Sequence, residues 1–318
     1  MHQPASDRAR GPLAIVVLSI ACVALAGCAS SSASPSSTSP SSTSQPRTTP
    51  AAAQFYVSLG DSYAAGYQPT GPHSGRTDTN GFAYQIPGLA AHKGYDLKLV
   101  NFGCGGATTT SIVSSVGCPP SLLGPGATPY PAETQAAAAE SFIRAHRADV
   151  GLITVSIGGN DVTPCANAAK PIPCVADALK TINKNLSVLL PALRSAAGPA
   201  VPIVGTTYPD VILGLDLSKS SSSRNLAVLS VTAFKDLINP ALEKQYQSVG
   251  GKLVDVTAAT GAYGPLTAKT DLPPYGEIPV PVAKVCELTF FCQYQDIHPH
   301  TAGYTIIAKL VVGTLPVR

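Results

Sequence analysis

Residues Phe55 to Gly66 read FYVSLGDSYAAG, an apolar run that breaks into Gly-Asp-Ser at positions 60–62. The apolar part has the length and composition of a buried strand, and the small residues after it can open a helix. A serine at this junction has an accessible hydroxyl, and the nearby backbone N–H groups can stabilise negative charge. Ser62 is therefore a candidate nucleophile, although serine is also a favoured helix N-cap.

Apolar strand candidates alternate with amphipathic segments along the rest of the chain. The strand candidates are Phe55 to Leu59, Leu97 to Phe102, Val150 to Ile157, Val201 to Thr206 and Lys252 to Val256. The helix candidates are Phe82 to Lys93, Ala132 to Arg147, Val175 to Ala197, Ser223 to Ser248 and Thr301 to Val312. This pattern predicts a parallel five-stranded sheet covered on both faces, in one three-layer α/β/α domain over residues 54–318. Ligands bind such sheets beyond the carboxyl ends of the strands.

Two further strand ends carry sequence that suits catalysis. The third strand ends in SIGGNDV, where paired glycines permit a tight turn and Asn160 offers a side-chain N–H to a developing oxyanion. The second strand ends in NFGCGGATT, whose glycines would let a backbone N–H approach a ligand closely. Each stretch is also compatible with a plain turn. Three strands thus bring a hydroxyl and two potential hydrogen-bond donors to one edge of the sheet.

The stretch QYQDIHPHTAGY, residues 293–304, supplies a candidate base just before the last helix. His298 can accept a proton from a serine at neutral pH, because the unperturbed pKa of histidine is about 6.5. His300 is the reserve candidate, with a solvent-facing position as the alternative. The remaining histidines of the exported chain are expected at the surface: His73, His92 and His146.

The segments LGDSYAAG, NFGCGGATT, SIGGND and IHP, in this order, resemble the four sequence blocks of the GDSL, or SGNH, hydrolases. The resemblance implies a flavodoxin-like sandwich, a serine nucleophile and a histidine base, with no cofactor or metal. Carried over residue by residue, it implies Ser62 as nucleophile and His298 as base. It also implies that the oxyanion is held by the N–H groups of Ser62 and Gly106 and by Asn160.

The acidic residue of the fourth sequence block does not lie at the position usual for the family. The family usually has Asp-x-x-His, which would put the acid at position 295, but this chain has Gln295 there and Asp296 two residues before His298. Either Asp296 reaches the imidazole from a differently shaped turn, or a main-chain carbonyl near Gln295 orients the ring. The first interpretation gives a catalytic triad of Ser62, His298 and Asp296.

Six of the eight cysteines fall into three close pairs after the N-terminal leader. Six cysteines allow fifteen connectivities, of which the local one is the simplest. The same three pairs resemble those of secreted actinobacterial members of the family. A metal site is the rival interpretation, but the chain lacks CxxC spacing with a nearby histidine pair. The expected disulfides are Cys104–Cys118, Cys165–Cys174 and Cys286–Cys292.

Residues 1–27 are expected to be an export signal, since Arg8 and Arg10 precede an apolar run too short for a lasting membrane span. The sequence LAGC at 25–28 resembles the bacterial lipobox, in which Cys28 becomes the lipidated first residue. The alternative is an ordinary secretory signal cleaved near Ala29. Residues 28–53 are almost wholly Ser, Thr, Pro and Ala and predict an extended tether. We therefore expect a cell-envelope lipoprotein, attached to the membrane through Cys28, or an extracellular protein.

The composition of the chain indicates which kinds of binding partner to expect. The formal net charge of +3 falls to +2 without Asp7, Arg8 and Arg10, and no basic cluster is present, so nucleic acid is not expected as a partner. The apolar stretch from Leu272 to Phe291 could form an acyl-chain wall, a lid or a cover over the core. We expect a monomeric esterase or lipase acting on small-molecule or lipid esters with short to medium acyl chains. The alternative is a catalytically weak, surface-tethered lipid-binding protein with the same fold.

Overall fold

The computed structural model describes residues 52–318. The expected export signal, the lipidation site Cys28 and nearly all of the expected tether lie outside the described residues. None of the helices in residues 52–318 combines the length and the apolar character needed to cross a membrane.

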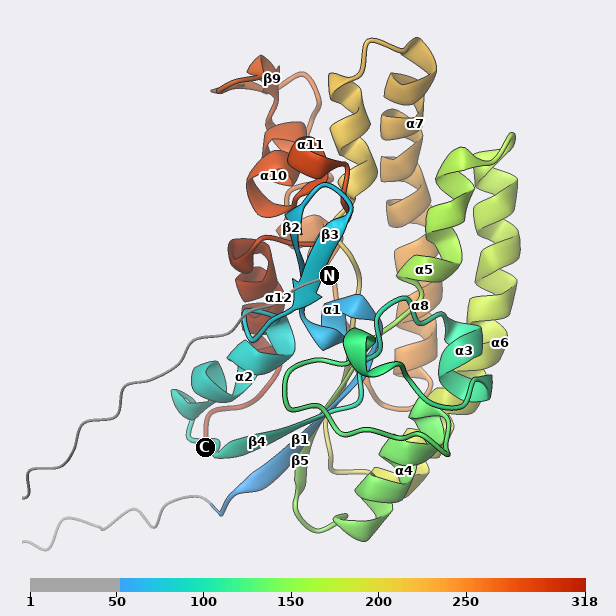
Figure 1. The fold of residues 1–318 in the computed structure, drawn as a ribbon, viewed down its shortest axis with the longest axis vertical. Helices are drawn as coiled ribbons and strands as arrows, with labels where there is room; N and C mark the ends of the chain where they lie inside the picture. Colours follow the sequence, from blue (N-terminus) through green and yellow to red (C-terminus); the bar gives the residue numbers. More distant parts are fainter. Residues whose placement is uncertain (1–51) are drawn as a thin grey trace, which may run out of the picture. The chain divides into compact units, whose positions relative to one another are not determined.

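A five-stranded parallel sheet forms the centre of the fold. Its strands are β1 (Gln54–Gly60), β4 (Leu97–Asn101), β5 (Val150–Ser156), β6 (Ile203–Thr206) and β7 (Lys252–Val254). They lie in the order β4-β1-β5-β6-β7, so β1 is flanked by β4 and β5. All seven residues of β5 are buried, as expected for a strand covered on both faces. The predicted α/β/α sandwich is confirmed (Figure 1).

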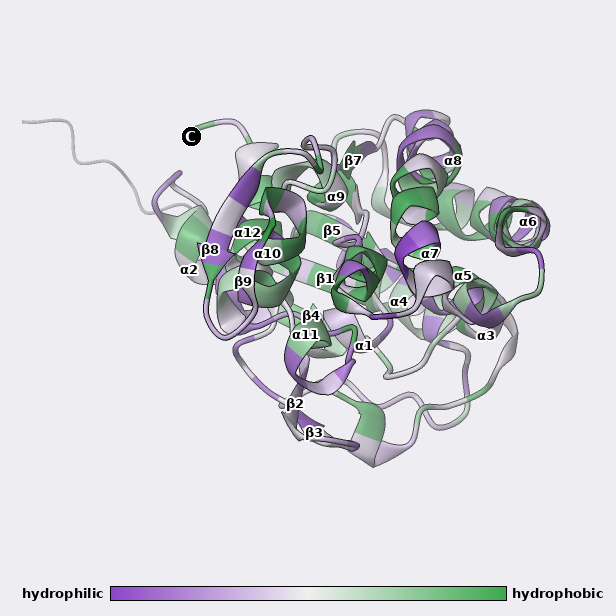
Figure 2. Cartoon of the chain, turned by 90° about the horizontal axis from the view of Figure 1, so that it is seen from above, coloured by the Kyte–Doolittle hydropathy of each residue, from purple (hydrophilic) through white to green (hydrophobic). Residues whose placement is uncertain are grey.

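Long helices cover both faces of the sheet. They are α2 (Phe82–Ala91), α4 (Gln135–Ala145), α6 (Pro171–Ala197), α8 (Asn239–Gln247) and α12 (Thr301–Gly313). Tyr56 of β1 packs in the same core cluster as Phe82 and Tyr304, whereas Val57 belongs to the cluster that contains Leu186. Neighbouring residues of a strand point to opposite faces. Seen from above (Figure 2), the strands accordingly lie between α2 and α12 on one side and α6 and α8 on the other.

The single helix expected from Ser223 to Ser248 is interrupted. α7 (Ser221–Thr232) runs into a π-helix, η4 (Ala233–Ile238), which leads into α8. Pro240 is the physical reason, because proline lacks the N–H of a regular helix and its ring clashes with the carbonyl four residues earlier. The wider π-helical turn accommodates this position.

Two hairpins and an additional helix lie in segments for which the sequence analysis predicted neither a strand nor a helix. β2 (Tyr67–Gly71) pairs with β3 (Ser74–Thr77), and β8 (Lys269–Leu272) pairs with β9 (Gly276–Pro279). α10 (Val280–Leu288) follows β9 directly. The remaining short helices are α1 (Ser62–Ala65), α3 (Thr109–Ser114), η1 (Pro120–Leu122), α5 (Gly159–Val162), η2 (Thr163–Asn167), η3 (Val211–Leu217), α9 (Val256–Ala259) and α11 (Phe291–Tyr294).

The structure contains the three disulfides expected from the sequence. Cys104–Cys118 joins the loop after β4 to the segment after α3, and Cys165–Cys174 joins η2 to the first turns of α6. Cys286–Cys292 joins α10 to α11. Each bridge closes a short loop next to a strand end or to the segment before α12, and therefore restricts the part of the chain that surrounds Ser62 and His298.

Candidate active site

The turn between β1 and α1 presents Ser62 at the carboxyl edge of the sheet. Gly60 has φ 139°, and a Cβ atom there would lie 2.0 Å from the Ser156 carbonyl oxygen, so only glycine fits. Asp61 is the N-cap of α1, because its side chain accepts a hydrogen bond from the Tyr63 N–H. The alternative interpretation of Ser62 as the cap is therefore wrong. Ser62 occupies the first helical position and is 7% exposed.

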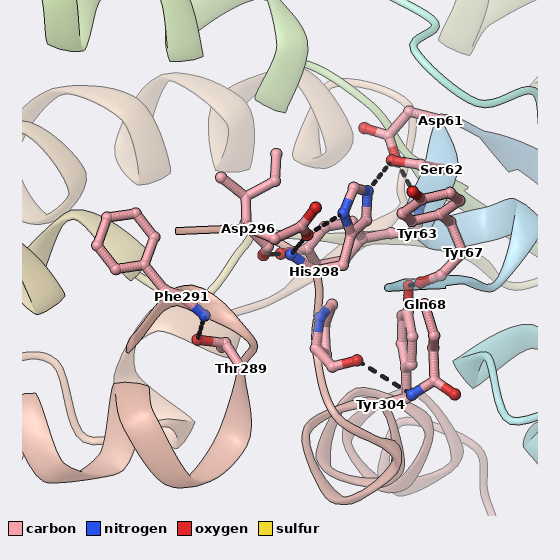
Figure 3. Close-up of polar contacts among 12 residues, drawn as sticks. Asp61, Ser62, Tyr63, Tyr67, Gln68, Thr289, Phe291, Asp296, His298 and Tyr304 are labelled. Atoms are coloured by element: carbon pink, nitrogen blue, oxygen red, sulfur yellow. Dashed lines mark hydrogen bonds and ion pairs between the residues drawn. The ribbon is translucent and has the colours of Figure 1, made fainter. Parts of the chain in front are cut away.

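Ser62, His298 and Asp296 form a continuous chain of hydrogen bonds (Figure 3). The Ser62 Oγ lies 2.7 Å from His298 Nε2, and His298 Nδ1 lies 2.6 Å from Asp296 Oδ1. The backbone N–H of His298 donates to the same carboxylate oxygen at 2.9 Å. Burial alone would raise the pKa of Asp296, but the hydrogen bonds and the charge of His298 outweigh it and hold that pKa below its usual value.

The backbone before Asp296 has an unusual conformation. Gln295 ends α11 with φ 54°, in the left-handed region that most residues avoid. Asp296 follows this turn directly and reaches the imidazole of His298 from only two residues away. Within the described chain, no hydrogen bond joins the Gln295 carbonyl to His298. The hydrogen-bond acceptor for His298 Nδ1 is thus the Asp296 carboxylate.

The segment that carries His298 is held by α1 and by the β2–β3 hairpin. The Tyr63 hydroxyl donates to the Ile297 carbonyl at 2.6 Å, and Gln68 Nε2 donates to the carbonyl of the residue after His298 at 3.2 Å. The Tyr67 ring lies 4.5 Å from the imidazole, measured between ring centroids (Figure 3). Tyr63 and Tyr67 therefore flank the imidazole and restrict its orientation.

The reserve candidate His300 lies outside this arrangement. Its ring stacks on Phe290, with centroids 4.0 Å apart and an interplanar angle of 14°. The side chain is half-buried, and burial lowers the pKa of His300. The solvent-facing alternative is therefore wrong, because aromatic stacking holds the ring against Phe290.

The three hydrogen-bond donors expected to hold the oxyanion differ in whether they already have a partner in the protein. The backbone N–H groups of Ser62 and Gly106 donate to no protein acceptor in residues 52–318. Asn160 Nδ2 donates one hydrogen to the Ala107 carbonyl at 2.9 Å, which leaves its second N–H available. Gly106 has φ 77°, and a Cβ atom there would meet nothing within 4 Å. The Asn160 contact with Ala107 brings the second and third strand ends together.

Asp161 fastens these two strand ends, a role that the sequence analysis missed. Its carboxylate accepts from the Thr109 N–H at 2.9 Å and from the Thr109 hydroxyl at 2.5 Å. Asp161 lies beside Asn160 in the SIGGND block, so the sequence indicated that it is close to the site. The sequence did not indicate its hydrogen-bond partner, because Thr109 comes 52 residues earlier in the chain.

Gln135 supports the serine turn from the first turn of α4 and was also missed. Its side-chain oxygen accepts from the Gly60 N–H at 2.7 Å, and its Nε2 donates to the Gly60 carbonyl at 3.0 Å. The side chain is 2% exposed. One buried amide thus pairs with both backbone groups of the residue before Asp61 and Ser62. No local pattern around Gln135 indicates this contact.

An apolar pocket opens beside Ser62 and extends between two walls. One wall comes from α5, η2 and the start of α6 and includes Val162 and Ile172. The other comes from the loop after β6, η3, α7 and η4 and includes Ile212 and Leu229. The two longer helices that contribute lining residues, α6 and α7, are labelled in Figure 1. Several apolar lining residues belong to the protein core, among them Ile182, Ile238 and Leu242.

The stretch from Leu272 to Phe291 contributes no lining residue to this pocket among the described parts of the chain. α10 instead buries Val282 and Val285 and packs against η3. The acyl-chain wall is therefore wrong, and the packing is that of a cover over the core: Val285 and Phe291 share a buried cluster with Leu213 of η3.

The cysteines and acidic residues offer no site for a metal ion in the part of the chain that the structure describes. No group of three or more His, Cys, Asp or Glu side chains is placed to hold one there. Cys104, Cys118, Cys165, Cys174, Cys286 and Cys292 are all engaged in disulfides.

Comparison with protein-family models identifies the family of the chain. The model of the GDSL-like Lipase/Acylhydrolase family matches residues 58–306, which include every polar residue of the site described above. The chain belongs to this family and is a carboxylic ester hydrolase of the GDSL type. Comparison with curated protein sequences gives no match.

Solved structures of similar fold include three lipolytic enzymes. Phospholipase A1 from Streptomyces albidoflavus NA297 is 18% identical over 83% of this chain and 100% of that chain, with a TM-score of 0.45. The lipase Lip_vut3 from a goat rumen metagenome is 15% identical over 82% and 96%, with a TM-score of 0.49. An extracellular lipase from Streptomyces rimosus is 19% identical over 81% and 99%, with a TM-score of 0.43.

Replacing Gln135 with Met should destabilise the protein. The change keeps the side-chain length but leaves the buried Gly60 N–H without a partner, and we expect the free energy of unfolding to fall by about 2 to 3 kcal/mol. Urea denaturation followed by circular dichroism measures this. The exposed Gln247 of α8 provides the control, since Gln247→Met should change stability by less than about 0.5 kcal/mol. Equal effects of the two substitutions would contradict a supporting role for Gln135.

Proposed function

We propose that this protein is an exported serine esterase that hydrolyses carboxylic esters of short to medium acyl chains through Ser62, His298 and Asp296. The observation that carries the proposal is the pair of hydrogen bonds at 2.7 Å and 2.6 Å that connects the three side chains. A serine hydroxyl is a weak nucleophile by itself and needs a base within hydrogen-bond reach. The base in turn needs a partner that fixes its tautomer, and the Asp296 carboxylate has the geometry for this.

The reaction proceeds in two half-reactions. Ser62 Oγ attacks the ester carbonyl carbon while its proton moves to His298 Nε2, and Asp296 stabilises the imidazolium that forms. The negative charge on the carbonyl oxygen is held by the N–H groups of Ser62 and Gly106 and by the free N–H of Asn160. The tetrahedral intermediate then collapses, and the alcohol leaves with the proton from His298. Water attacks the acyl-enzyme by the same route and releases the carboxylic acid.

The apolar pocket supports an acyl chain as the part of the substrate beside Ser62. Its lining combines Val, Ile, Leu, Ala and Phe side chains, several of which belong to the protein core. Burial of each methylene group in such a pocket is worth about 0.8 kcal/mol. Core residues in the lining restrict the length of chain that the pocket can hold, which favours short to medium acyl chains, including those of lipids.

Export is supported by the three disulfides, because such bonds persist in oxidising compartments and are rare in the cytosol. The signal-like residues 1–27 and the LAGC sequence at 25–28 support attachment to the membrane through Cys28. The Ser/Thr/Pro-rich residues 28–53 would then hold the hydrolase domain away from the membrane surface.

Substitution of Ser62, His298 or Asp296 should strongly lower the rate of ester hydrolysis. With a series of p-nitrophenyl esters, Ser62→Ala and His298→Ala should lower kcat by at least about 10³-fold, and Asp296→Asn by about 10³- to 10⁴-fold. His92→Ala, at an exposed helix end, is the control and should leave kcat unchanged. A loss below tenfold for Asp296→Asn would show that another group orients His298. A wild-type rate no higher than that of Ser62→Ala would favour the lipid-binding alternative.

Filling the pocket should shorten the preferred acyl chain. Ala233 lines the pocket from η4 and is 6% exposed, so Ala233→Phe places a ring in the space proposed for the acyl chain. We expect kcat/KM for the octanoate ester to fall about tenfold or more while that for the acetate ester changes less than about threefold. Val188→Phe, at a 62% exposed position of α6, should leave both values unchanged. An equal loss for both esters in Ala233→Phe would contradict an acyl-binding role of the pocket.

Mass spectrometry of the mature N-terminal peptide tests whether a lipid is attached at Cys28. When the full chain is expressed in a bacterium that processes lipoproteins, the mature N-terminal peptide should begin at Cys28 and carry the mass of a diacylglyceryl group. The Cys28→Ser variant should appear in the culture medium or retain its signal peptide. A mature N-terminus near Ala29 without lipid would support the ordinary secretory signal instead.

A further inference from the structure

Tyr208 belongs to none of the sequence blocks, yet its hydroxyl reaches into the serine turn. It lies two residues after β6, and its side chain is 8% exposed. The hydroxyl donates to Asp61 Oδ2 at 2.6 Å. Asp61 is the residue immediately before Ser62, so this hydrogen bond connects the fourth strand along the sheet to the turn that carries the proposed nucleophile.

Asp61 is a buried carboxylate that depends on this partner. It is 1% exposed, and its other oxygen accepts from the Tyr63 N–H at 2.9 Å. Burial raises the pKa of Asp61 to about 6, although the hydrogen bonds from Tyr208 and Tyr63 and the charge of His298 oppose the rise. The carboxylate is therefore ionised at neutral pH only by a small margin. Loss of a donor to its ionised form would raise the pKa of Asp61 further.

The ring of Tyr208 also contacts two other parts of the site. A Cβ atom on Gly159 would lie 2.9 Å from Tyr208 Cζ, so the ring packs directly against the residue before Asn160. The ring meets that of Tyr63 edge-on at a centroid distance of 5.0 Å. The Tyr208 backbone is itself fixed, because the Thr257 hydroxyl donates to its carbonyl at 2.7 Å.

His298 acts electrostatically on Asp61 across the serine turn. A positive charge on the imidazole favours the ionised form of the Asp61 carboxyl and lowers its pKa. The negative charge of Asp161, in α5, disfavours the ionised form of Asp61 and raises its pKa. The titratable groups that face Asp61 from the surrounding elements are Tyr63 of α1, Asp161 of α5, Tyr208 after β6, His298 before α12 and Tyr304 of α12.

We propose that Tyr208 is a positioning residue for ester hydrolysis: its hydroxyl holds the buried Asp61 carboxylate in place, which fixes the turn of Ser62 and stabilises the positive charge that His298 acquires. The inference rests on the proposed function of Ser62 and His298. It adds to it the buried carboxylate of Asp61, the residue immediately before Ser62. Tyr208 touches neither the reacting atoms nor the imidazole and acts through Asp61.

The test is a double-mutant cycle with Tyr208→Phe and Asp61→Asn, measured as kcat and KM for p-nitrophenyl acetate between pH 5 and 9. The acetate ester is used because Tyr208 also lines the apolar pocket, and a short acyl group keeps binding effects small. Tyr208→Phe should lower kcat at pH 7 about tenfold, the size expected from one hydrogen bond to a charged group. KM should stay within about twofold. The acidic limb of the kcat profile should move to higher pH, because Asp61 without its donor is protonated there.

The cycle separates action through Asp61 from other effects. Adding Tyr208→Phe to Asp61→Asn should change kcat by less than about twofold, since the group through which the hydroxyl acts is already neutral. Tyr246→Phe is the matched control: it removes another buried hydroxyl, bonded to the Val155 carbonyl at 3.2 Å, and should leave kcat and the pH profile unchanged.

Three results would overturn the inference. They are an unchanged kcat and pH profile in Tyr208→Phe, a change confined to KM, and a Tyr208→Phe effect that adds in full to that of Asp61→Asn. Failure of the proposed function would look different, because the wild type would then be no faster than Ser62→Ala at any pH. Tyr208→Phe keeps the ring and its packing, so a loss of kcat at an unchanged thermal midpoint supports the positioning role.

Discussion

The hydrogen bond between Ser62 and His298 joins residues that are 236 positions apart, and most of the polar structure around it serves to hold its two ends. Ser62 follows the strand β1, which lies inside the sheet between β4 and β5, so its backbone position is set by the most constrained part of the fold. His298 lies in an irregular segment before α12 that has no strand to fix it. Tyr63 bridges the two, since it follows Ser62 in the chain and its hydroxyl binds the Ile297 carbonyl. The serine turn thereby positions the histidine segment directly.

Burial of this arrangement requires that its polar groups find partners inside the protein. A buried polar group without a hydrogen bond costs about 1 to 3 kcal/mol, and a charged one costs more. Three side chains provide such partners. Asp61 accepts from the Tyr63 N–H as a helix cap, and the Gln135 amide accepts from the Gly60 N–H. Asp161 accepts from the Thr109 N–H. The backbone N–H of Ser62 is the exception, because this residue is 7% exposed and its N–H has no acceptor in residues 52–318. A donor left free at a buried position suits a group that is present only while substrate is bound.

The sequence predicted what depends on neighbouring residues and missed what depends on distant ones. The five strands follow from local apolar runs, and Ser62, Asn160 and His298 stand out because each lies at the end of a strand or just before a helix. Gln135 and Tyr208 occupy ordinary positions in the sequence, and only the fold brings them to Gly60 and Asp61. The contact of Asp296 with His298 remained ambiguous because it depends on one backbone angle.

The same distinction applies to the larger elements. The apolar character of the stretch from Leu272 to Phe291 was recognised, but whether it faced a substrate or the core depends on how α10 packs against η3. The break in the segment from Ser223 to Ser248 had a local signal, Pro240, that the helical pattern concealed. The three disulfides are the simplest of the fifteen possible connectivities, because each joins the two cysteines that are nearest in sequence, and the family resemblance pointed to the same pairs.

The π-helix η4 has a consequence for how the shape of the pocket can change. A π-helical turn contains about one residue more than an α-helical turn, and it holds this extra residue while the flanking helices α7 and α8 keep their own faces toward the core. Removal of one residue from η4 would return this segment to α-helical geometry and change which of its side chains face the pocket, to which Ala233 and Ile238 now contribute. A single deletion at this point can therefore remodel the pocket while β1, Ser62 and His298 stay where they are. The number of residues in one helical turn, as much as side-chain volume, is a variable by which such a hydrolase can diverge in specificity.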